Sequence, residues 1–410
     1  MINNMIKICI LGGGFGGLYT ALYLNNHPLV KSRKCQITLV ERNDNFLFTP
    51  LLYELITGEL QRWEIAPTYQ KLLAKTSIKF SQNTIKDIDF SDRQVGLANG
   101  DYLSYDYLVL AVGTQNRWVN IPGLRNYALT FRTLADLERL QGELNLLETS
   151  DRKHLKLAII GGGPNGVELA CKLADYLGKR GEIILIERGN QILKGFSKGV
   201  KSASYKALGN RGVQIYLDTR VNNIESDSIT LTRHEKTFML AVDRVIWVAG
   251  TTSREWVKNL GVKHNKSGKI LTLSSLQLLD YPEVFALGDI AEISHSNQWI
   301  PATAQVAYQQ ANCTAKNIIA AIKGKKLHSF YYLHLGDMLT LGKGAAIVSS
   351  FSLNIEGYLA SVIRRLAYIF RLPTLRHRNQ VLRNLQQKVI LKIRGVFSWK
   401  VIKVLLKYEL

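Results

Sequence analysis

The sequence predicts an α/β fold that contains two Rossmann-like dinucleotide-binding domains, and two observations lead to this prediction. First, a short apolar run, a glycine-rich turn and a helical pattern follow one another at the start of the chain. Second, the same succession recurs from residue 155 onward, which indicates a distant internal repeat. The 410 residues are enough for two or three packed domains.

The first repeat begins with the apolar run Ile6–Leu11, which is typical of a buried parallel strand. Three glycines follow it with the spacing GxGxxG: Gly12, Gly14 and Gly17. In this spacing the first glycine permits a tight turn, the second lets the backbone approach a pyrophosphate, and the third lets the helix pack closely on the strand. The next apolar run ends at Glu41, where a carboxylate can bind ribose hydroxyl groups. We therefore predict a dinucleotide site here.

The second repeat has the same parts in the same order. The apolar run Leu155–Ile160 leads into three glycines with the same spacing: Gly161, Gly163 and Gly166. A further apolar run ends at Glu187, which favours NADH because a carboxylate repels a 2′-phosphate. Arg188 follows, and an arginine there can accommodate that phosphate, so NADPH stays open. Two sites predict two dinucleotides, and a flavin with a nicotinamide makes a working redox pair.

The order of the strands indicates that the second domain is inserted into the first. Three apolar runs end in glycine turns: Tyr107–Thr114, Val242–Thr252 and Val284–Ala291. The first closes the first half, the second closes the second half, and the third resumes the first domain after the insertion. We expect residues 1–150 and 242–325 to form an FAD-binding domain, residues 151–241 an NAD(P)H-binding domain, and residues 326–410 a separate C-terminal region.

Composition narrows the function. The formal net charge is +21, and the last 60 residues hold 12 Lys and Arg against two acids, a local excess of +10. Such charge favours an anionic membrane surface or phosphorylated ligands. Nucleic acid is a weaker prediction, because the dinucleotide motifs give it no role. Four isolated cysteines and unpaired histidines predict neither a disulfide framework nor a metal site.

The motifs together resemble a known family. The segments GGGFGGLYTA, LAVGT, IIGGGPNGVELA, VAGTT and FALGD resemble the two-dinucleotide flavoprotein reductases. Within them, Phe46–Leu55 and Pro301–Ala311 look like the type II NAD(P)H:quinone dehydrogenases, whose specific element is AQxAxQ. Four further segments are most similar to the cyanobacterial and plastid branch, which includes demethylphylloquinone reductase. They are Trp63–Pro67, Phe131–Leu134, Leu185–Gly189 and Arg371–Arg378.

This resemblance implies roles for particular residues. It places FAD on the first glycine motif and NADH or NADPH on the second. It implies that Asp289 binds the ribityl chain or phosphate of the flavin, with Gly113 and Thr114 beside the cofactor. It implies that Glu168 lies near the nicotinamide on a proton route, and that Gln305 and Gln309 line the quinone pocket. An ordinary surface acid at Glu168, or an ordinary polar helix face at the two glutamines, is the alternative.

The C-terminal region predicts basic amphipathic helices. One apolar stripe, flanked by Arg364 and Arg365, comprises Leu359, Val362, Ile363, Leu366 and Phe370. A second comprises Phe397, Val401, Val404, Leu405 and Tyr408, opposite Lys400, Lys403 and Lys407. Such helices suit an anchor on anionic lipid; docking on the core, or on a second copy in a homodimer, is the alternative. No targeting peptide and no spanning stretch is visible, so we expect a peripheral protein on the cytoplasmic side of an inner or thylakoid membrane.

The resulting hypothesis is an FAD-dependent NAD(P)H:quinone oxidoreductase that does not pump protons and reduces a membrane quinone, demethylphylloquinone or another naphthoquinone. Two other functions remain open. A sulfide:quinone reductase uses the same scaffold but needs a redox cysteine pair beside the flavin. A flavoprotein sensor would bind NADH without quinone turnover, and the intact AQxAxQ element argues against it.

Overall fold

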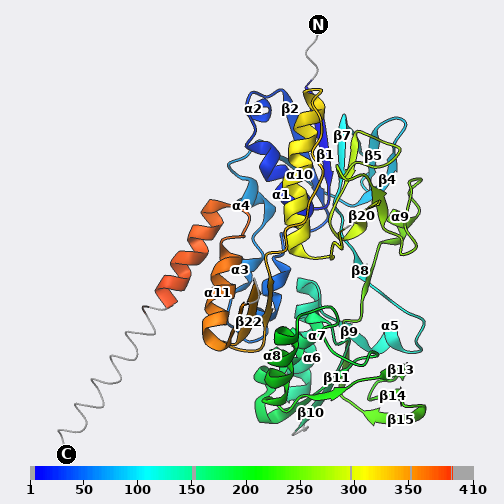
Figure 1. Ribbon diagram of the computed structural model, residues 1–410, viewed down its shortest axis with the longest axis vertical. Coiled ribbons are helices and arrows are strands. Elements are labelled where there is room, and N and C mark those ends of the chain that lie inside the picture. Colours follow the sequence, from blue (N-terminus) through cyan, green and yellow to red (C-terminus); the bar gives the residue numbers. More distant parts are fainter. Residues whose placement is uncertain (1–4, 150–153, 296–297, 351–352, 389, 391–410) are drawn as a thin grey trace, which may run out of the picture.

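The computed structural model describes residues 5–149, 154–295, 298–350, 353–388 and 390. Two parallel sheets lie toward opposite ends of the long axis, and the C-terminal elements lie beside the region between them (Figure 1). The predicted internal repeat is thus two separate α/β units. Each is a five-stranded parallel sheet with a buried apolar core.

The first sheet has the strand order β19-β7-β1-β2-β3, and all its strands are parallel. Its strands are β1 (Ile6–Leu11), β2 (Cys35–Glu41), β3 (Lys79–Gln82), β7 (Tyr107–Leu110) and β19 (Val284–Ala286). The helices α1 (Phe15–Asn25) and α10 (Ala304–Ile322) pack side by side against it, with the short α2 (Pro28–Lys31) nearby. The strand β19 returns after the second unit, so the second unit is inserted into the first, as predicted.

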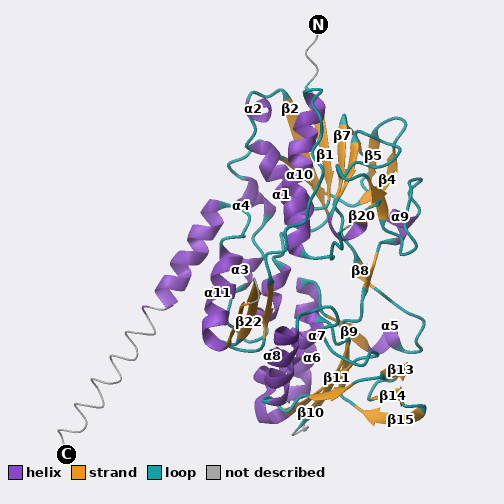
Figure 2. Ribbon diagram, in the orientation of Figure 1, coloured by secondary structure: helices purple, strands orange, loops and turns teal. Residues whose placement is uncertain are grey.

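The second sheet has the order β12-β11-β10-β16-β9. Its strands are β9 (Ala128–Thr130), β10 (Leu155–Ile160), β11 (Gly181–Ile186), β12 (Gln214–Tyr216) and β16 (Arg244–Trp247). The helices α6 (Leu134–Thr149), α7 (Pro164–Leu177) and α8 (Lys198–Gly209) gather beside these strands (Figure 2).

The pairing of these strands corrects the expected domain boundaries. We expected the second unit to span residues 151–241, but β16 pairs with β10 and β9 pairs with β16. The unit therefore starts before β9 and ends after β16. The physical reason is that a strand joins the sheet whose neighbouring strand still offers unpaired N–H and C=O groups, and the local sequence pattern does not show which sheet that is.

Smaller elements complete both units. Antiparallel sheets are formed by β4 (Ile85–Asp89), β5 (Gln94–Leu97) and β6 (Tyr102–Ser104), and by β13 (Thr219–Ile224), β14 (Ser228–Arg233) and β15 (Lys236–Ala241). The two-stranded pair β8 (Gln115–Asn116) and β17 (Thr251–Thr252) lies where the chain passes between the units, and β18 (Ile270–Thr272) pairs with β20 (Ala291–Ile293). Short helices are η1 (Thr49–Leu55), α3 (Arg62–Ile65), α4 (Tyr69–Leu73), α5 (Leu124–Tyr127), η2 (Gly178–Arg180), α9 (Glu255–Lys258) and η3 (Gly288–Ile290).

The C-terminal region begins with an antiparallel sheet that the sequence analysis did not predict. Its strands are β21 (Asp337–Thr340), β22 (Ala346–Ser350) and β23 (Leu353–Glu356), followed by α11 (Gly357–Ile369) and by helical residues 375–388. This region packs against α7 and α8 of the second unit. The second predicted stripe, which starts at Phe397, lies outside the described residues. In the part of the chain that the structure describes, no helix is long and apolar enough to cross a membrane.

The orientation of α11 corrects one detail of the predicted amphipathic helix. Its apolar stripe faces solvent, with Leu359 61% and Phe370 62% exposed. Arg364, which we expected to flank that stripe, instead points inward and is buried. The inward turn has a physical cause, because two buried carboxylates from distant segments pair with this guanidinium.

Candidate functional site

The first glycine loop joins β1 to α1 and has the shape of a phosphate cradle. Gly12 has φ +98°, which favours glycine, and a Cβ on Gly17 would lie 1.8 Å from the carbonyl oxygen of Gly12. Both positions therefore require glycine to hold the turn. A Cβ on Gly14 would meet no atom within 4 Å, so the loop leaves open space at the N-terminus of α1. That space, backed by free helix N–H groups, suits a pyrophosphate.

The second glycine loop, between β10 and α7, repeats this geometry. Gly161 has φ +121°, a Cβ on Gly166 would lie 1.8 Å from the oxygen of Gly161, and a Cβ on Gly163 would meet nothing within 4 Å. Pro164 begins α7 directly after this loop. The two loops are thus built alike and both fit a dinucleotide, which is what the two sequence motifs predicted.

A carboxylate closes each loop. The N–H of Gly13 donates to Glu41 Oε2 at 2.8 Å, and the N–H of Gly162 donates to Glu187 Oε2 at 2.6 Å. Each acid therefore stands at the end of the second strand of its unit, beside the cradle, where a ribose would lie. Arg188 is exposed next to Glu187.

Three residues that are far apart in the chain meet beside the first cradle. The hydroxyl of Thr114 donates to Asp289 Oδ2 at 3.2 Å, and Arg132 Nη2 donates to the hydroxyl of Thr114 at 2.9 Å. Gly113 has φ +62°, and a Cβ there would meet no atom within 4 Å. The structure thus brings together three of the predicted residues and adds Arg132. This arginine belongs to the segment FRTL, which carried part of the family resemblance but no role.

Helix α10 connects this cluster to the predicted quinone residues. Gln310, which is 3% exposed, accepts the N–H of Gly288 at 2.7 Å and so holds the turn before Asp289. Gln309 does not stand free on its helix face. Its amide accepts the N–H of Leu333 at 3.0 Å and donates to the carbonyl of the same residue at 2.8 Å. Gln305 accepts a hydrogen bond from the hydroxyl of Tyr332 at 2.5 Å.

Glu168 is not the surface acid that its place in the first turns of α7 allowed as an alternative. Its side chain is 9% exposed, it accepts the N–H of Thr340 at 2.9 Å, and Arg364 Nη2 lies 3.4 Å from its Oε1. Burial raises the pKa of Glu168 to about 7, although Arg364 and the Thr340 amide oppose this rise. A buried carboxyl with this pKa can gain or lose a proton near neutral pH.

Arg364 ties a second carboxylate to the same cluster. It forms an ion pair with Glu54, donates to the carbonyl of Pro50 at 2.7 Å, and lies 4.9 Å from the ring centre of Tyr368. Burial opposes its charge, but the Glu54 carboxylate beside it raises the pKa of Arg364 above the ordinary value. Glu54 Oε2 and Arg364 Nε have no hydrogen-bond partner among the described residues. Sequence analysis missed this pair, because nothing local links the two residues.

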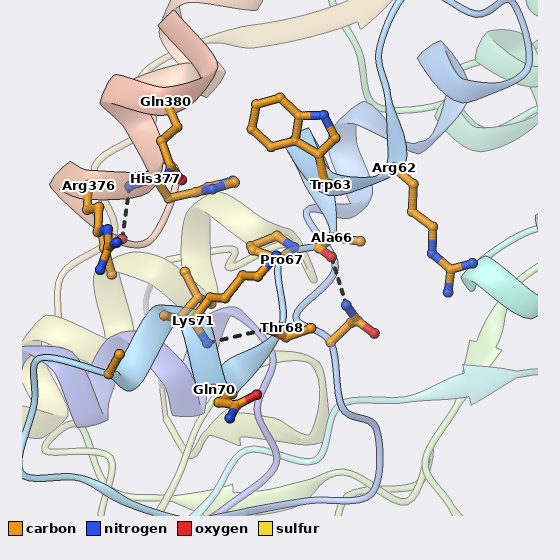
Figure 3. A pocket seen from close by; sticks show the side chains of 14 residues that line it. Arg62, Trp63, Ala66, Pro67, Thr68, Gln70, Lys71, Arg376, His377 and Gln380 are labelled. Atoms are coloured by element: carbon orange, nitrogen blue, oxygen red, sulfur yellow. Dashed lines mark hydrogen bonds between the residues drawn. The ribbon is translucent and has the colours of Figure 1, made fainter. Parts of the chain in front are cut away.

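A cavity of about 850 Å³ lies between α3, α4 and the helical residues 375–388. Figure 3 shows the side chains that line it. Trp63 and Pro67 supply part of an apolar lining, and three basic side chains stand around it: Arg62, Lys71 and Arg376. The neighbouring Leu375 is 73% exposed. This side of the molecule therefore combines apolar surface with positive charge. Within the described ranges, no group of three or more His, Cys, Asp or Glu residues is arranged to hold a metal ion.

Residues 6–311 match the sequence model of the family described as pyridine nucleotide-disulphide oxidoreductase. The chain belongs to this family. It is also 42% identical over 376 residues to "Demethylphylloquinone reductase NdbB" of Synechocystis sp. (strain ATCC 27184 / PCC 6803 / Kazusa), which covers 90% of this chain and 93% of that protein. It is 36% identical over 415 residues to "Alternative NAD(P)H-ubiquinone oxidoreductase C1, chloroplastic/mitochondrial" of Arabidopsis thaliana, with 92% and 80% covered. These similarities confirm the resemblance to type II NAD(P)H:quinone oxidoreductases and show that this family member is an oxidoreductase.

Solved structures agree on the fold. "NDH2 from plasmodium falciparum in complex with NADH" superposes with a TM-score of 0.81 at 20% identity, over 92% of this chain and 97% of that one. The sulfide:quinone oxidoreductase of the hyperthermophilic bacterium Aquifex aeolicus superposes with a TM-score of 0.75 at 20% identity, over 91% and 92%. At such identities the likeness concerns the fold alone, and it confirms the predicted α/β architecture.

The cysteines distinguish this chain from a thiol-dependent member of the same fold. Cys9 lies in β1, Cys35 in β2, Cys171 in α7 and Cys313 in α10, and all four are free. Burial raises the pKa of Cys9 and Cys171 to about 12 and that of Cys313 to about 11. These thiols stay protonated near neutral pH, whereas redox chemistry at sulfur needs an accessible thiolate.

Proposed function

We propose that this oxidoreductase transfers a hydride from NADH or NADPH to FAD and passes two electrons on to a membrane quinone. One observation carries the proposal. A single helix, α10, holds the turn before Asp289 through Gln310 and carries Gln305 and Gln309 on an adjoining face. The residues that would bind the flavin and those that would bind the quinone are therefore linked by one rigid element.

The two cradles support this assignment of cofactors. The open space at Gly14 would hold the pyrophosphate of FAD, with Glu41 at its ribose and Asp289, Thr114 and Gly113 along the rest of the molecule. FAD bound there supplies the hydride acceptor and the two-electron donor of the reaction. The matching space at Gly163 would hold the nicotinamide dinucleotide. Glu187 favours NADH, and the exposed Arg188 leaves room for NADPH.

Glu168 would serve as a proton reservoir for the quinone. Two-electron reduction of a quinone to a quinol consumes two protons, and a buried site must supply them from nearby groups. The pKa of about 7 allows Glu168 to hold a proton at neutral pH and release it into the site. Arg364 keeps the carboxyl in place at 3.4 Å while both groups remain shielded from water.

The surface beside the C-terminal helices would dock on an anionic membrane on its cytoplasmic side. The exposed stripe of α11 supplies apolar contact, and the basic residues around the cavity in Figure 3 supply attraction to anionic headgroups. A quinone with a long apolar tail would enter from this membrane. The names of the relatives from Synechocystis sp. and Arabidopsis thaliana support a demethylated naphthoquinone or a ubiquinone as the substrate class.

Anaerobic stopped-flow on FAD-loaded protein tests the proposal. The flavin is first reduced with NADH or NADPH, then mixed with a short-chain naphthoquinone or ubiquinone. We expect fast reoxidation by quinone in the wild type and slow reoxidation in the Gln305→Ala, Gln309→Ala double variant. The control is Gln94→Ala, an exposed glutamine of β5 that lies outside α10. Fast reduction by NAD(P)H without quinone-dependent reoxidation would instead indicate a sensor, and reduction by sulfide would indicate a sulfide:quinone reductase.

A further inference from the structure

A row of hydrogen-bonding side chains leads away from Gln305 toward the surface. The hydroxyl of Tyr332 donates to Gln305 Oε1 at 2.5 Å, and His334 Nδ1 lies 3.1 Å from the same hydroxyl. His334 Nε2 in turn lies 3.8 Å from Asp337 Oδ2. The Nε2 of Gln305 makes no hydrogen bond with any described residue, so that end of the amide is available to a ligand. His334 itself is 55% exposed at its side chain.

The segment that carries Tyr332 is held firmly in place. The side chain of Gln298 accepts the N–H of Tyr332 at 3.0 Å and donates to its carbonyl at 2.6 Å. Gln309 makes the same pair of bonds with the backbone of Leu333. Two neighbouring residues are thus each clamped by one amide. As a result Tyr332 is 5% exposed, while the adjacent Tyr331 is 76% exposed.

The hydroxyl proton of Tyr332 couples the hydrogen bonds of Gln305 and His334. A phenol hydroxyl donates one hydrogen bond and can accept another. When it donates to Gln305 Oε1, His334 Nδ1 must be the donor to the tyrosine oxygen. When His334 Nδ1 is an acceptor, the hydroxyl donates to it, and the amide of Gln305 must turn over to donate its Nε2 group. The hydrogen-bond state of His334 therefore determines which end of the Gln305 amide remains free.

We propose that Tyr332 is a positioning residue that couples the orientation of the Gln305 amide to the hydrogen-bond state of His334, and thereby tunes the site between quinone and quinol. This inference rests on the proposed function, in which Gln305 contacts the quinone. With a donor at His334 Nδ1, the free Nε2 group of Gln305 matches a quinone carbonyl, which only accepts. With an acceptor at His334 Nδ1, the free Oε1 of Gln305 matches a quinol hydroxyl, which donates.

The charged groups around this row are compatible with the coupling. Burial raises the pKa of Tyr332 and Asp337 raises it further, whereas Arg371 opposes them. The phenol therefore keeps its proton at neutral pH, as the coupling requires. Burial also raises the pKa of Asp337, which His334 opposes. Among the described residues, Asp337 and Arg371 are the charged groups that act on Tyr332 in this row.

The test separates binding of the oxidised and reduced substrate. Steady-state and stopped-flow kinetics with a short-chain naphthoquinone and its quinol are measured between pH 5.5 and 8.5 on the FAD-loaded protein. We expect Tyr332→Phe to raise the KM for quinone by about threefold to tenfold, the effect of one lost hydrogen bond. The ratio of the quinol inhibition constant to the quinone KM should vary with pH in the wild type. It should not vary in Tyr332→Phe or His334→Ala.

Matched variants make the outcomes distinct. Tyr331→Phe removes a hydroxyl from the exposed neighbour and should behave as the wild type. Flavin absorbance should be retained in every variant, which shows that all are folded and loaded with FAD, and reduction of the flavin by NADH should be unchanged in Tyr331→Phe. If Gln305→Ala impairs the quinone reaction but Tyr332→Phe matches Tyr331→Phe, the coupling is wrong and the quinone site stands. If Gln305→Ala is also without effect, the proposed quinone site itself is wrong.

Discussion

Removal of the guanidinium of Arg364 should be among the most damaging single changes away from the cofactor loops. Arg364 is 4% exposed at its side chain and pairs with Glu54 and Glu168, which are 7% and 9% exposed. Arg364→Ala leaves both carboxylates buried without a cation. Breaking a buried ion pair in this way costs about 3–5 kcal/mol. If the chain unfolds as one unit, an unfolding entropy of about 2 cal/mol/K per residue converts this loss into a fall in Tm of about 3–6 °C.

The dependence of this loss on pH checks its electrostatic origin. Burial already raises the pKa of Glu168, and without Arg364 this rise is less opposed. A carboxyl whose folded pKa lies above its unfolded pKa adds stability below the unfolded value, and that stability disappears as the pH rises through the folded value. The fall in Tm should therefore be largest at pH 8 and clearly smaller at pH 5.5. Addition of Glu168→Gln to the variant should recover part of the loss at pH 8.

Differential scanning calorimetry on the FAD-loaded protein at both pH values provides the measurement. Arg365→Ala is the matched control, because it removes the same group from the next position of α11. The guanidinium of Arg365 donates to the backbone carbonyl of Glu59 at 2.8 Å and pairs with neither Glu54 nor Glu168 among the described contacts. It should lower Tm by less than the Arg364 variant and equally at both pH values. A fall of under about 1 °C for Arg364→Ala at pH 8, or a fall that does not depend on pH, would refute the reasoning.

Three further predictions concern the cofactors and the membrane. Gly14→Ala adds a methyl group to the space that would hold the pyrophosphate, so the variant should fold normally and lose most of its FAD absorbance after purification. Gly17→Ala should instead fail to fold, because its methyl group would meet the oxygen of Gly12. Arg188→Ala should raise the KM for NADPH by about tenfold and leave that for NADH unchanged, as expected for one lost charge-assisted hydrogen bond; an equal effect on both would show that the arginine does not contact the 2′-phosphate. Leu359→Asp and Phe370→Asp should each weaken sedimentation with anionic vesicles by about tenfold, because each removes an exposed apolar side chain from the stripe of α11 that we propose meets lipid. Unchanged binding would mean that this stripe does not meet the membrane.

Local patterns predicted the parts of this protein whose geometry is set within a few residues. The run of β1, the glycine turn and the start of α1 are adjacent in the chain, and so are their counterparts in the second unit. The steric demands at Gly12 and Gly17 arise within one turn, so the spacing alone was sufficient to predict the cradle. The acids Glu41 and Glu187 follow for the same reason, because each ends the strand that begins after the first helix.

Other features were decided only when distant segments met. Strand pairing assigned β9 and β16 to the second sheet, although their sequences suit either sheet. The Tyr332 hydroxyl reached Gln305 only because two amides clamp the backbone around it. The antiparallel sheet of the C-terminal region was likewise missed, because its short strands carry no strong alternation.

Arg364 shows most clearly where prediction from sequence ends. Its position in α11 predicted a charge at the edge of an apolar stripe, and periodicity alone gives no other answer. In the folded chain it pairs with Glu54, 310 residues away, and with Glu168, 196 residues away. A guanidinium is buried only where nearby buried negative charge offsets the free-energy cost of removing it from water. The sequence by itself therefore determined the two cradles and their order, whereas the tertiary structure decided which charges are buried together and which surface faces outward.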